Sequence, residues 1–147
     1  MSTTRFRSER GQALIEVALS LPLLLLVTVG IFEFGRAYQT WQVLTNAARE
    51  GARLAVLPGM NDDVVKTRVK DYLTAGVLDV DQIAATTVAV THNEPIALGA
   101  NTALGSKVTV QFPFKFMVMK PVAQLLVSSS TAGDDFTMAA SAMMRNE

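Results

Sequence analysis

An apolar run near the N-terminus limits the folds that are open to this chain. From Ala13 to Phe32 the sequence holds 20 residues and a single charged one, Glu16. As a helix, a run of this length rises ~30 Å, about the thickness of the hydrocarbon core of a bilayer. The remainder of a 147-residue chain could hardly surround a helix that is apolar on every face. We therefore expect a helix that spans a membrane, with Glu33 in water at its far margin.

The flanking charges predict the orientation of this helix. Arg5, Arg7 and Arg10 precede it, against one acid, Glu9. Because basic residues favour the cytoplasmic side, we expect the N-terminus in the cytoplasm and the chain after Phe34 outside it. The run is too long for an ordinary secretory signal, and no small-residue cleavage site follows it. The predicted segments are a leader at 1–11 (disordered over 1–10), a transmembrane segment at 12–34, an extracytoplasmic part of the same helix at 35–57, and a small α+β domain at 58–147.

A helical pattern continues beyond the membrane segment and ends at Leu57-Pro58-Gly59, because the residue before a proline avoids the helical region. Its apolar face has spacings of three and four: Phe34, Tyr38, Trp41, Leu44, Ala48, Ala52 and Ala55. One side of this helix carries only small side chains: Ala47, Ala48, Gly51, Ala52 and Ala55. Small side chains let another backbone approach closely. Two partners fit this side: the chain's own small domain, or a neighbouring subunit.

The rest of the chain predicts a second helix and a small sheet. Asn61 is placed to cap the helix and Gly76 to end it. Its expected buried residues are Val65, Val69, Tyr72 and Leu73. Alternating polarity predicts strands at 83–91, 107–116 and 136–144, with a loop at 92–105 and a helical turn at 120–127. Within the second strand, Pro113 indicates an edge position or a bulge.

Together these elements predict an α+β fold, with a long N-terminal helix, a second helix and a three-stranded antiparallel sheet. The second strand places its apolar side chains on one face: Val108, Val110, Phe112, Phe114 and Phe116. We expect this face to pack on the Trp41 side of the long helix.

The composition also excludes several kinds of chemistry. The chain has no cysteine and one histidine, His92, which excludes thiol chemistry, disulfides and multi-histidine metal sites. Its formal net charge is zero, so we expect no nucleic-acid partner. It carries no motif of a phosphate-binding loop, zinc protease or serine hydrolase, and Asp79 and Asp81 lack the other ligands of a calcium loop. We expect no enzyme activity, cofactor or metal site, and we expect His92 to be a solvated loop residue.

The informative pattern lies at the start of the helix. Gly11 and Glu16, with four residues between them, follow a basic leader and precede the membrane segment. This pattern resembles the processing site of type IV pilin-like precursors, which implies that a prepilin peptidase cuts after Gly11 and leaves Gln12 as the new N-terminus. A lone carboxylate is costly in a bilayer, and the new α-amine would offer a neighbouring Glu16 a partner. Alternatively, Glu16 only reaches the cytoplasmic interface.

A longer resemblance narrows the family. Residues 10–38, RGQALIEVALSLPLLLLVTVGIFEFGRAY, and 46–53, NAAREGAR, resemble the TadE-like family of pilin-like proteins, which serve the Tad (tight adherence, Flp) pilus machinery of bacteria. The principal Flp pilins are shorter and carry a tyrosine where Val17 stands here, which favours a minor pseudopilin. The resemblance implies an inner-membrane protein with a periplasmic C-terminal domain. Its implied partners are the prepilin peptidase, a companion pseudopilin and the major pilin.

Two functions from other classes remain open at this point. The chain could be an uncleaved, signal-anchored periplasmic module that binds or senses a ligand, or an accessory domain of an adhesin. Both differ from the pseudopilin in keeping residues 1–11.

Overall fold

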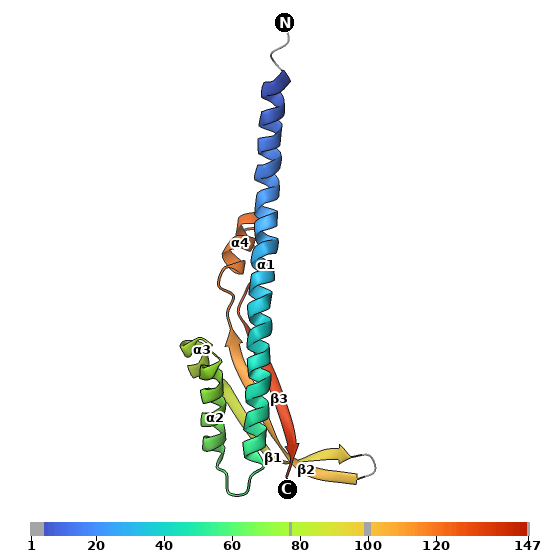
Figure 1. Cartoon of the computed structure of the whole chain (residues 1–147), viewed down its shortest axis with the longest axis vertical. Coiled ribbons are helices and arrows are strands. Elements are labelled where there is room, and N and C mark those ends of the chain that lie inside the picture. Colours follow the sequence, from blue (N-terminus) through green and yellow to red (C-terminus); the bar gives the residue numbers. More distant parts are fainter. Residues whose placement is uncertain (1–4, 77, 99–100, 147) are drawn as a thin grey trace. The chain divides into compact units, whose positions relative to one another are not determined.

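A computed structural model of the chain describes residues 5–76, 78–98 and 101–146 (Figure 1). The elements are helices α1 (Arg5–Ala55), α2 (Asp62–Ala75) and α3 (Val80–Ala84), strands β1 (Thr87–Leu98) and β2 (Asn101–Phe114), helix α4 (Met119–Leu126) and strand β3 (Phe136–Arg145). The predicted α+β fold, with its long N-terminal helix and three-stranded antiparallel sheet, is confirmed. The chain forms two compact units. The first unit extends to Arg36 and includes Lys115–Asp134, and the second contains Ala37–Phe114 and the chain from Asp135.

Helix α1 is continuous over 51 residues. It begins at Arg5, so the expectation of a disordered leader is wrong for residues 5–10, while residues 1–4 lie outside the described residues. No proline separates residues 5–10 from the apolar run, and extending an existing helix is easier than nucleating one. The helix ends at Ala55, two residues before the predicted end, and a turn follows in which the Leu57 N–H donates to the Leu54 carbonyl.

In the first unit, α4 lies beside α1 (Figure 1). A Cβ added at Gly30 would lie 3.9 Å from Met119 Cε, so the helices are close at this point. The rings of Phe34 and Phe116 meet edge to face, with their centroids 6.2 Å apart. The predicted helical turn at 120–127 is therefore present as α4, shifted by one residue at each end.

The second unit is built on a sheet with the strand order β1-β2-β3. In the antiparallel register, Val108 of β2 pairs with Val90 of β1 and with Ala142 of β3. The apolar face of β2 is buried as predicted, at Val108, Val110, Phe112 and Phe114. In α2, Val65, Val69 and Leu73 are buried as expected, whereas Tyr72 is exposed.

The predicted loop at 92–105 is wrong for most of its length, because β1 continues to Leu98 and β2 begins at Asn101. The two strands pair from Glu94 with Gly105 to Leu98 with Asn101. An irregularity in the pairing lies between Thr91 and Glu94, and Asn93 within it has a φ of 60°. Asparagine tolerates this left-handed conformation, so the sequence that suggested a loop instead forms a bulge in a long hairpin.

The start of the first strand also differs from the prediction. Ile83 lies in α3, and β1 begins four residues later, at Thr87. The side chain of Asp79 accepts a hydrogen bond from the Gln82 N–H at 3.0 Å and caps this short helix. Asp79 therefore has the structural role of a helix cap.

Pro113 lies in the central strand β2, near its end, where the predicted edge position is confirmed locally. Because β1 begins at Thr87, opposite Gln111, only β3 pairs with β2 at Pro113. The end of the central strand is therefore locally an edge, where a residue without an N–H is tolerated.

The buried face of α1 in the second unit also differs from the predicted one. Tyr38 and Trp41 are 61% and 47% exposed, so the prediction that the sheet packs on the Trp41 side is wrong. The neighbouring positions Ala37 and Thr40 are buried instead, followed by Leu44. The prediction assigned the buried face from the large aromatic side chains. It did not include the polar residue Thr40, which lies on the face that packs inward.

Candidate processing junction and assembly surface

The predicted processing junction lies in the first part of α1. Gly11 and Gln12 are helical and exposed, and a Cβ added at Gly11 would meet nothing within 4 Å. Glycine lowers helix stability by ~1 kcal/mol relative to alanine, which favours local opening at this point.

The predicted assembly carboxylate, Glu16, is exposed and lies four residues after Gln12. Its main-chain oxygen accepts a hydrogen bond from the Ser20 hydroxyl at 2.9 Å. Among the residues whose side chains the structure describes, none donates a hydrogen bond to its carboxylate. The carboxylate can therefore accept a hydrogen bond from a group outside the chain.

The helix surface that follows Glu16 is apolar and uncovered. Within the described residues, α1 is the one helix long and apolar enough to cross a membrane; its most apolar window has a mean hydropathy of 2.4 and is not buried. Its large exposed side chains include Leu14, Ile15, Leu19, Leu24, Ile31 and Phe32. The core helix of a soluble protein would be covered, so this helix fits a membrane anchor.

The five small residues of α1 lie in the core of the second unit: Ala47, Ala48, Gly51, Ala52 and Ala55. A Cβ added at Gly51 would lie 2.7 Å from Val69 Cγ2 of α2 and 3.1 Å from Val108 Cγ1 of β2. Glycine at this position therefore allows α1 to contact both elements. Of the two partners that the sequence allowed, the structure places the chain's own domain here.

Glu33 is a buried residue whose role the sequence did not reveal. Its predicted position in water is wrong, because its side chain is 0% exposed. Glu33 Oε1 accepts hydrogen bonds from the N–H groups of Met117, at 2.8 Å, and Val118, at 2.7 Å. Glu33 Oε2 accepts from Arg36 Nη2 at 3.0 Å, and Arg36 also donates to the main-chain oxygen of Lys115. These bonds stabilise the buried charge and hold the segment that leads into α4.

Two sequence signals could have revealed this position. Arg36 follows Glu33 by three residues, the spacing of an ion pair on a helix. Glu33 also precedes Ala37 and Thr40 at spacings of four and three, so it continues the buried pattern if polar residues are included.

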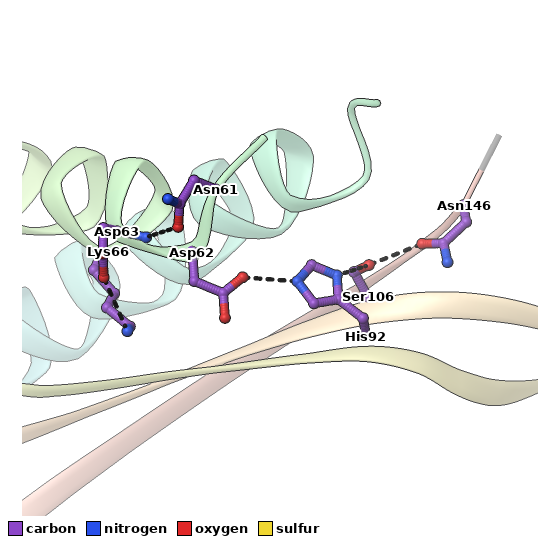
Figure 2. A network of polar contacts seen from close by, with 7 residues as sticks. All are labelled: Asn61, Asp62, Asp63, Lys66, His92, Ser106 and Asn146. Atoms are coloured by element: carbon purple, nitrogen blue, oxygen red, sulfur yellow. Dashed lines mark hydrogen bonds and ion pairs between the residues drawn. The ribbon is translucent and has the colours of Figure 1, made fainter. Parts of the chain in front are cut away.

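His92 belongs to a polar network in the second unit (Figure 2). The expectation of a loop residue is wrong, because His92 lies in β1. Its side chain is exposed as expected, at 40%, but both of its ring nitrogens have partners within the chain. Nε2 lies 2.8 Å from Asp62 Oδ1 of α2, and Nδ1 lies 3.0 Å from Ser106 Oγ of β2. Ser106 donates to Asn146 Oδ1 at 2.8 Å and is 1% exposed. The network therefore ties α2, the β-hairpin and the residue after β3 together.

A second polar contact joins α1 to α2 at the surface. Glu50 accepts hydrogen bonds from Arg53 Nη2 at 2.9 Å and from Arg68 Nη2 at 3.3 Å. The hydrogen bond from Arg53 holds the pKa of Glu50 below its usual value, and the same contact raises the pKa of Arg53. Glu50 borders an open cavity of about 530 Å³, whose lining also includes Asp63 and Asp71. Within the described residues, no three acidic or histidine side chains are grouped closely enough to hold a metal ion.

Comparison with known proteins places the recognisable part of the chain in α1. Residues 11–53 match the family model described as TadE-like protein. Searches of the curated proteins and of the solved structures found no match to the chain. The matched residues contain the junction, Glu16, the apolar segment and four of the five small residues. A TadE-like domain supports an involvement with the Tad pilus system and an association with its components. The resemblance seen in the sequence is confirmed: residues 11–53 of this chain are a TadE-like domain.

Proposed function

We propose that the chain is a minor pseudopilin of a Tad-type pilus assembly and secretion system. Its N-terminus lies in the cytoplasm, the apolar part of α1 spans the inner membrane, and the second unit lies in the periplasm. A prepilin peptidase cuts between Gly11 and Gln12, and the mature protein acts in the initiation or assembly of the pilus. The supporting observation is a TadE-like helix that exposes Gly11 and Glu16 at the start of an uncovered apolar surface.

In this proposal, Glu16 sets the register between neighbouring helices. Cleavage creates an α-amine at Gln12, one helical turn before Glu16. The amine of one subunit pairs with the Glu16 carboxylate of the next, an attraction of ~4 kcal/mol at ~4 Å and an effective dielectric constant of ~20, before desolvation is subtracted. Any other stagger would leave both charges unpaired among apolar side chains. The pair therefore selects one axial offset between neighbouring helices. The role of Glu16 in this proposal is structural, not catalytic.

The partner subunit is expected on the exposed aromatic side of α1. Tyr38 and Trp41 lie on one side of the helix with their ring centroids 6.3 Å apart, and both are exposed. The small residues around Ala48 are buried within the chain itself. A companion pseudopilin or the major pilin therefore contacts the Tyr38 side of α1 and not the Ala48 side.

Replacement of Glu16 tests this mechanism. Glu16→Ala should be processed normally but should lose pili and lose cross-links between a photoreactive group at Tyr38 and the partner subunit. Glu9→Ala is the matched control, since it removes a carboxylate from the leader and leaves the mature chain unchanged. Electron microscopy of piliation and recovery of the cross-linked pair measure the outcome. Normal piliation of Glu16→Ala would refute the proposed pairing of Glu16 with the α-amine of a neighbouring subunit.

A further inference from the structure

We propose that α4 is an interfacial helix, whose exposed apolar residues lie in the lipid of the outer surface of the membrane that α1 crosses. The inference rests on the membrane anchoring of α1 in the proposed function. It does not depend on cleavage after Gly11 or on assembly through Glu16.

The contacts between α4 and α1 set the depth of α4 in the membrane. Met119 Cε would lie 3.9 Å from a Cβ at Gly30, and the Glu33 carboxylate accepts from the N–H groups of Met117 and Val118. Gly30 is two residues before Phe32, the end of the apolar run, which is ~3 Å of helix rise. The start of α4 is therefore at the level where the membrane-spanning segment leaves the hydrocarbon core.

The large or apolar side chains of α4 and its flanking residues divide into two sets, while Lys120, Pro121 and Gln124 of the same helix are exposed. One set is buried: Met119, Val122 and Ala123. The other set is apolar but exposed: Met117, Val118, Leu125, Leu126 and Val127. The most exposed of these, Leu125, is 74% accessible, similar to the 73% of Ile31 in the apolar run of α1. A helix that lies on a membrane buries an apolar face at the boundary between headgroups and acyl chains, and the exposed apolar side of this segment fits that position.

The polar groups of this segment are also compatible with lipid. An N–H group without a partner is costly near hydrocarbon, and the Glu33 carboxylate provides partners for two of them, those of Met117 and Val118. Lys120 pairs with Asp134 at 2.7 Å, and both side chains are about half exposed. The buried carboxylate therefore allows the start of α4 to approach the lipid without leaving these two backbone groups unsatisfied.

Single-tryptophan variants of the full chain in lipid vesicles test the proposal. In a Trp41→Phe background, Leu125→Trp is reconstituted into phosphatidylcholine–phosphatidylglycerol vesicles with bromine at a shallow or a deep acyl position. Leu24→Trp, in the apolar run, is the control for a membrane-spanning position, and Val64→Trp, exposed on α2, is the control for a position in water. The expected result is a blue shift and a loss of fluorescence for Leu125→Trp with shallow bromines. Leu24→Trp should lose fluorescence with deep bromines, and Val64→Trp with neither.

Each other outcome overturns the proposal in a distinguishable way. Quenching of Leu24→Trp without quenching of Leu125→Trp would leave the anchor intact and reject the interfacial position of α4. Absence of quenching at Leu24→Trp would reject the anchor itself. Quenching of Val64→Trp as strong as that of Leu125→Trp would show non-specific adsorption to the vesicles and would reject a specific interfacial position of α4. A blue shift of Leu125→Trp that disappears when the protein is diluted in lipid would show that another copy of the chain, not lipid, covers α4.

Discussion

Glu33 is a charged residue at a position where an apolar one would leave backbone groups without partners. The hydrogen bonds that its carboxylate accepts come from Met117 and Val118, 84 and 85 residues away in the sequence. Val118, the residue that precedes α4, has no side chain able to cap the helix, so the carboxylate comes from another element. A hydropathy profile places Glu33 at the end of a membrane segment, because the profile contains no information about partners so distant in the sequence. The ion pair with Arg36 is the local part of this arrangement and could have been predicted.

Removal of this carboxylate should release the segment that leads into α4. In Glu33→Ala the N–H groups of Met117 and Val118 lose their acceptor and the partly exposed Arg36 loses its ion pair; the loss of hydrogen bonds to a charged group typically costs ~1.5–3 kcal/mol. Hydrogen exchange followed by mass spectrometry should then show faster exchange over residues 117–126. Glu33→Gln, which keeps an amide oxygen for the two N–H groups, should have an intermediate effect.

A surface carboxylate provides the control for this experiment. Glu94 lies 3.9 Å from Lys107 and both side chains are partly exposed, so Glu94→Ala should leave the exchange of residues 117–126 unchanged. Exchange in Glu33→Ala equal to that of the wild type would contradict the role assigned to Glu33.

Gly51 should resist substitution because of its neighbours in α2 and β2. In Gly51→Ala the new Cβ would lie 2.7 Å from Val69 Cγ2 and 3.1 Å from Val108 Cγ1. Overpacking of this kind costs ~1–3 kcal/mol, and the helix propensity of alanine returns ~1 kcal/mol. The free energy of unfolding, measured by urea titration of the full chain in detergent micelles, should therefore fall by up to ~2 kcal/mol. Gly35→Ala, with nothing within 4 Å of its Cβ, should not lower it. Equal values for the two variants would refute the close packing.

The sequence correctly predicted the helices and strands that are defined by local signals, such as helix caps and alternating apolar residues. Asn61 caps α2 through a hydrogen bond from the Asp63 N–H at 3.1 Å, and Gly76 ends the helix, as expected. The alternation of Val108 and Val110 correctly assigned the buried face of β2. These signals depend on residues only a few positions apart, so a single sequence contains them.

The sequence did not predict elements that depend on distant pairing. The extension of β1 from Glu94 to Leu98 contains Pro95, and its partners begin at Asn101. Because β1 is an edge strand, it can contain a proline. Pairing with β2 therefore overrides residues that usually indicate a loop. The docking of α4 beside α1 is likewise absent from any local pattern.

The hairpin should lose stability when the His92 network is broken. His92→Ala removes the contacts to Asp62 and Ser106, and a typical hydrogen bond contributes ~0.5–1.5 kcal/mol to stability. Urea titration should show a lower free energy of unfolding, with faster hydrogen exchange in β1 near the bulge. Lys107→Ala, which removes a surface pair with a separation of 3.9 Å, is the control and should change little. Wild-type stability of His92→Ala would mean that the network does not contribute.

Helix α1 belongs to both compact units and contains the entire TadE-like match. The matched residues, 11–53, extend from the junction through the apolar segment into the core of the second unit. The sheet and α4 lie outside the match, so they were predictable only from general patterns of helices and strands. The family, the apolar anchor and the site residues on α1 could therefore be proposed from the sequence. The surroundings of Glu33 and His92 required the structure.

The proposed function requires that the mature form of α1 begins at Gln12, after a cut at Gly11. The mass of the intact protein, purified from the membranes of its native host, measures where the chain begins. We expect the mature chain to begin at Gln12, and we expect Gly11→Val, which places a β-branched residue at the junction, to retain the leader. A wild-type chain that still begins at Met1 or Ser2 would refute cleavage at this junction. It would favour an uncleaved anchored binding or sensor module, or an adhesin domain.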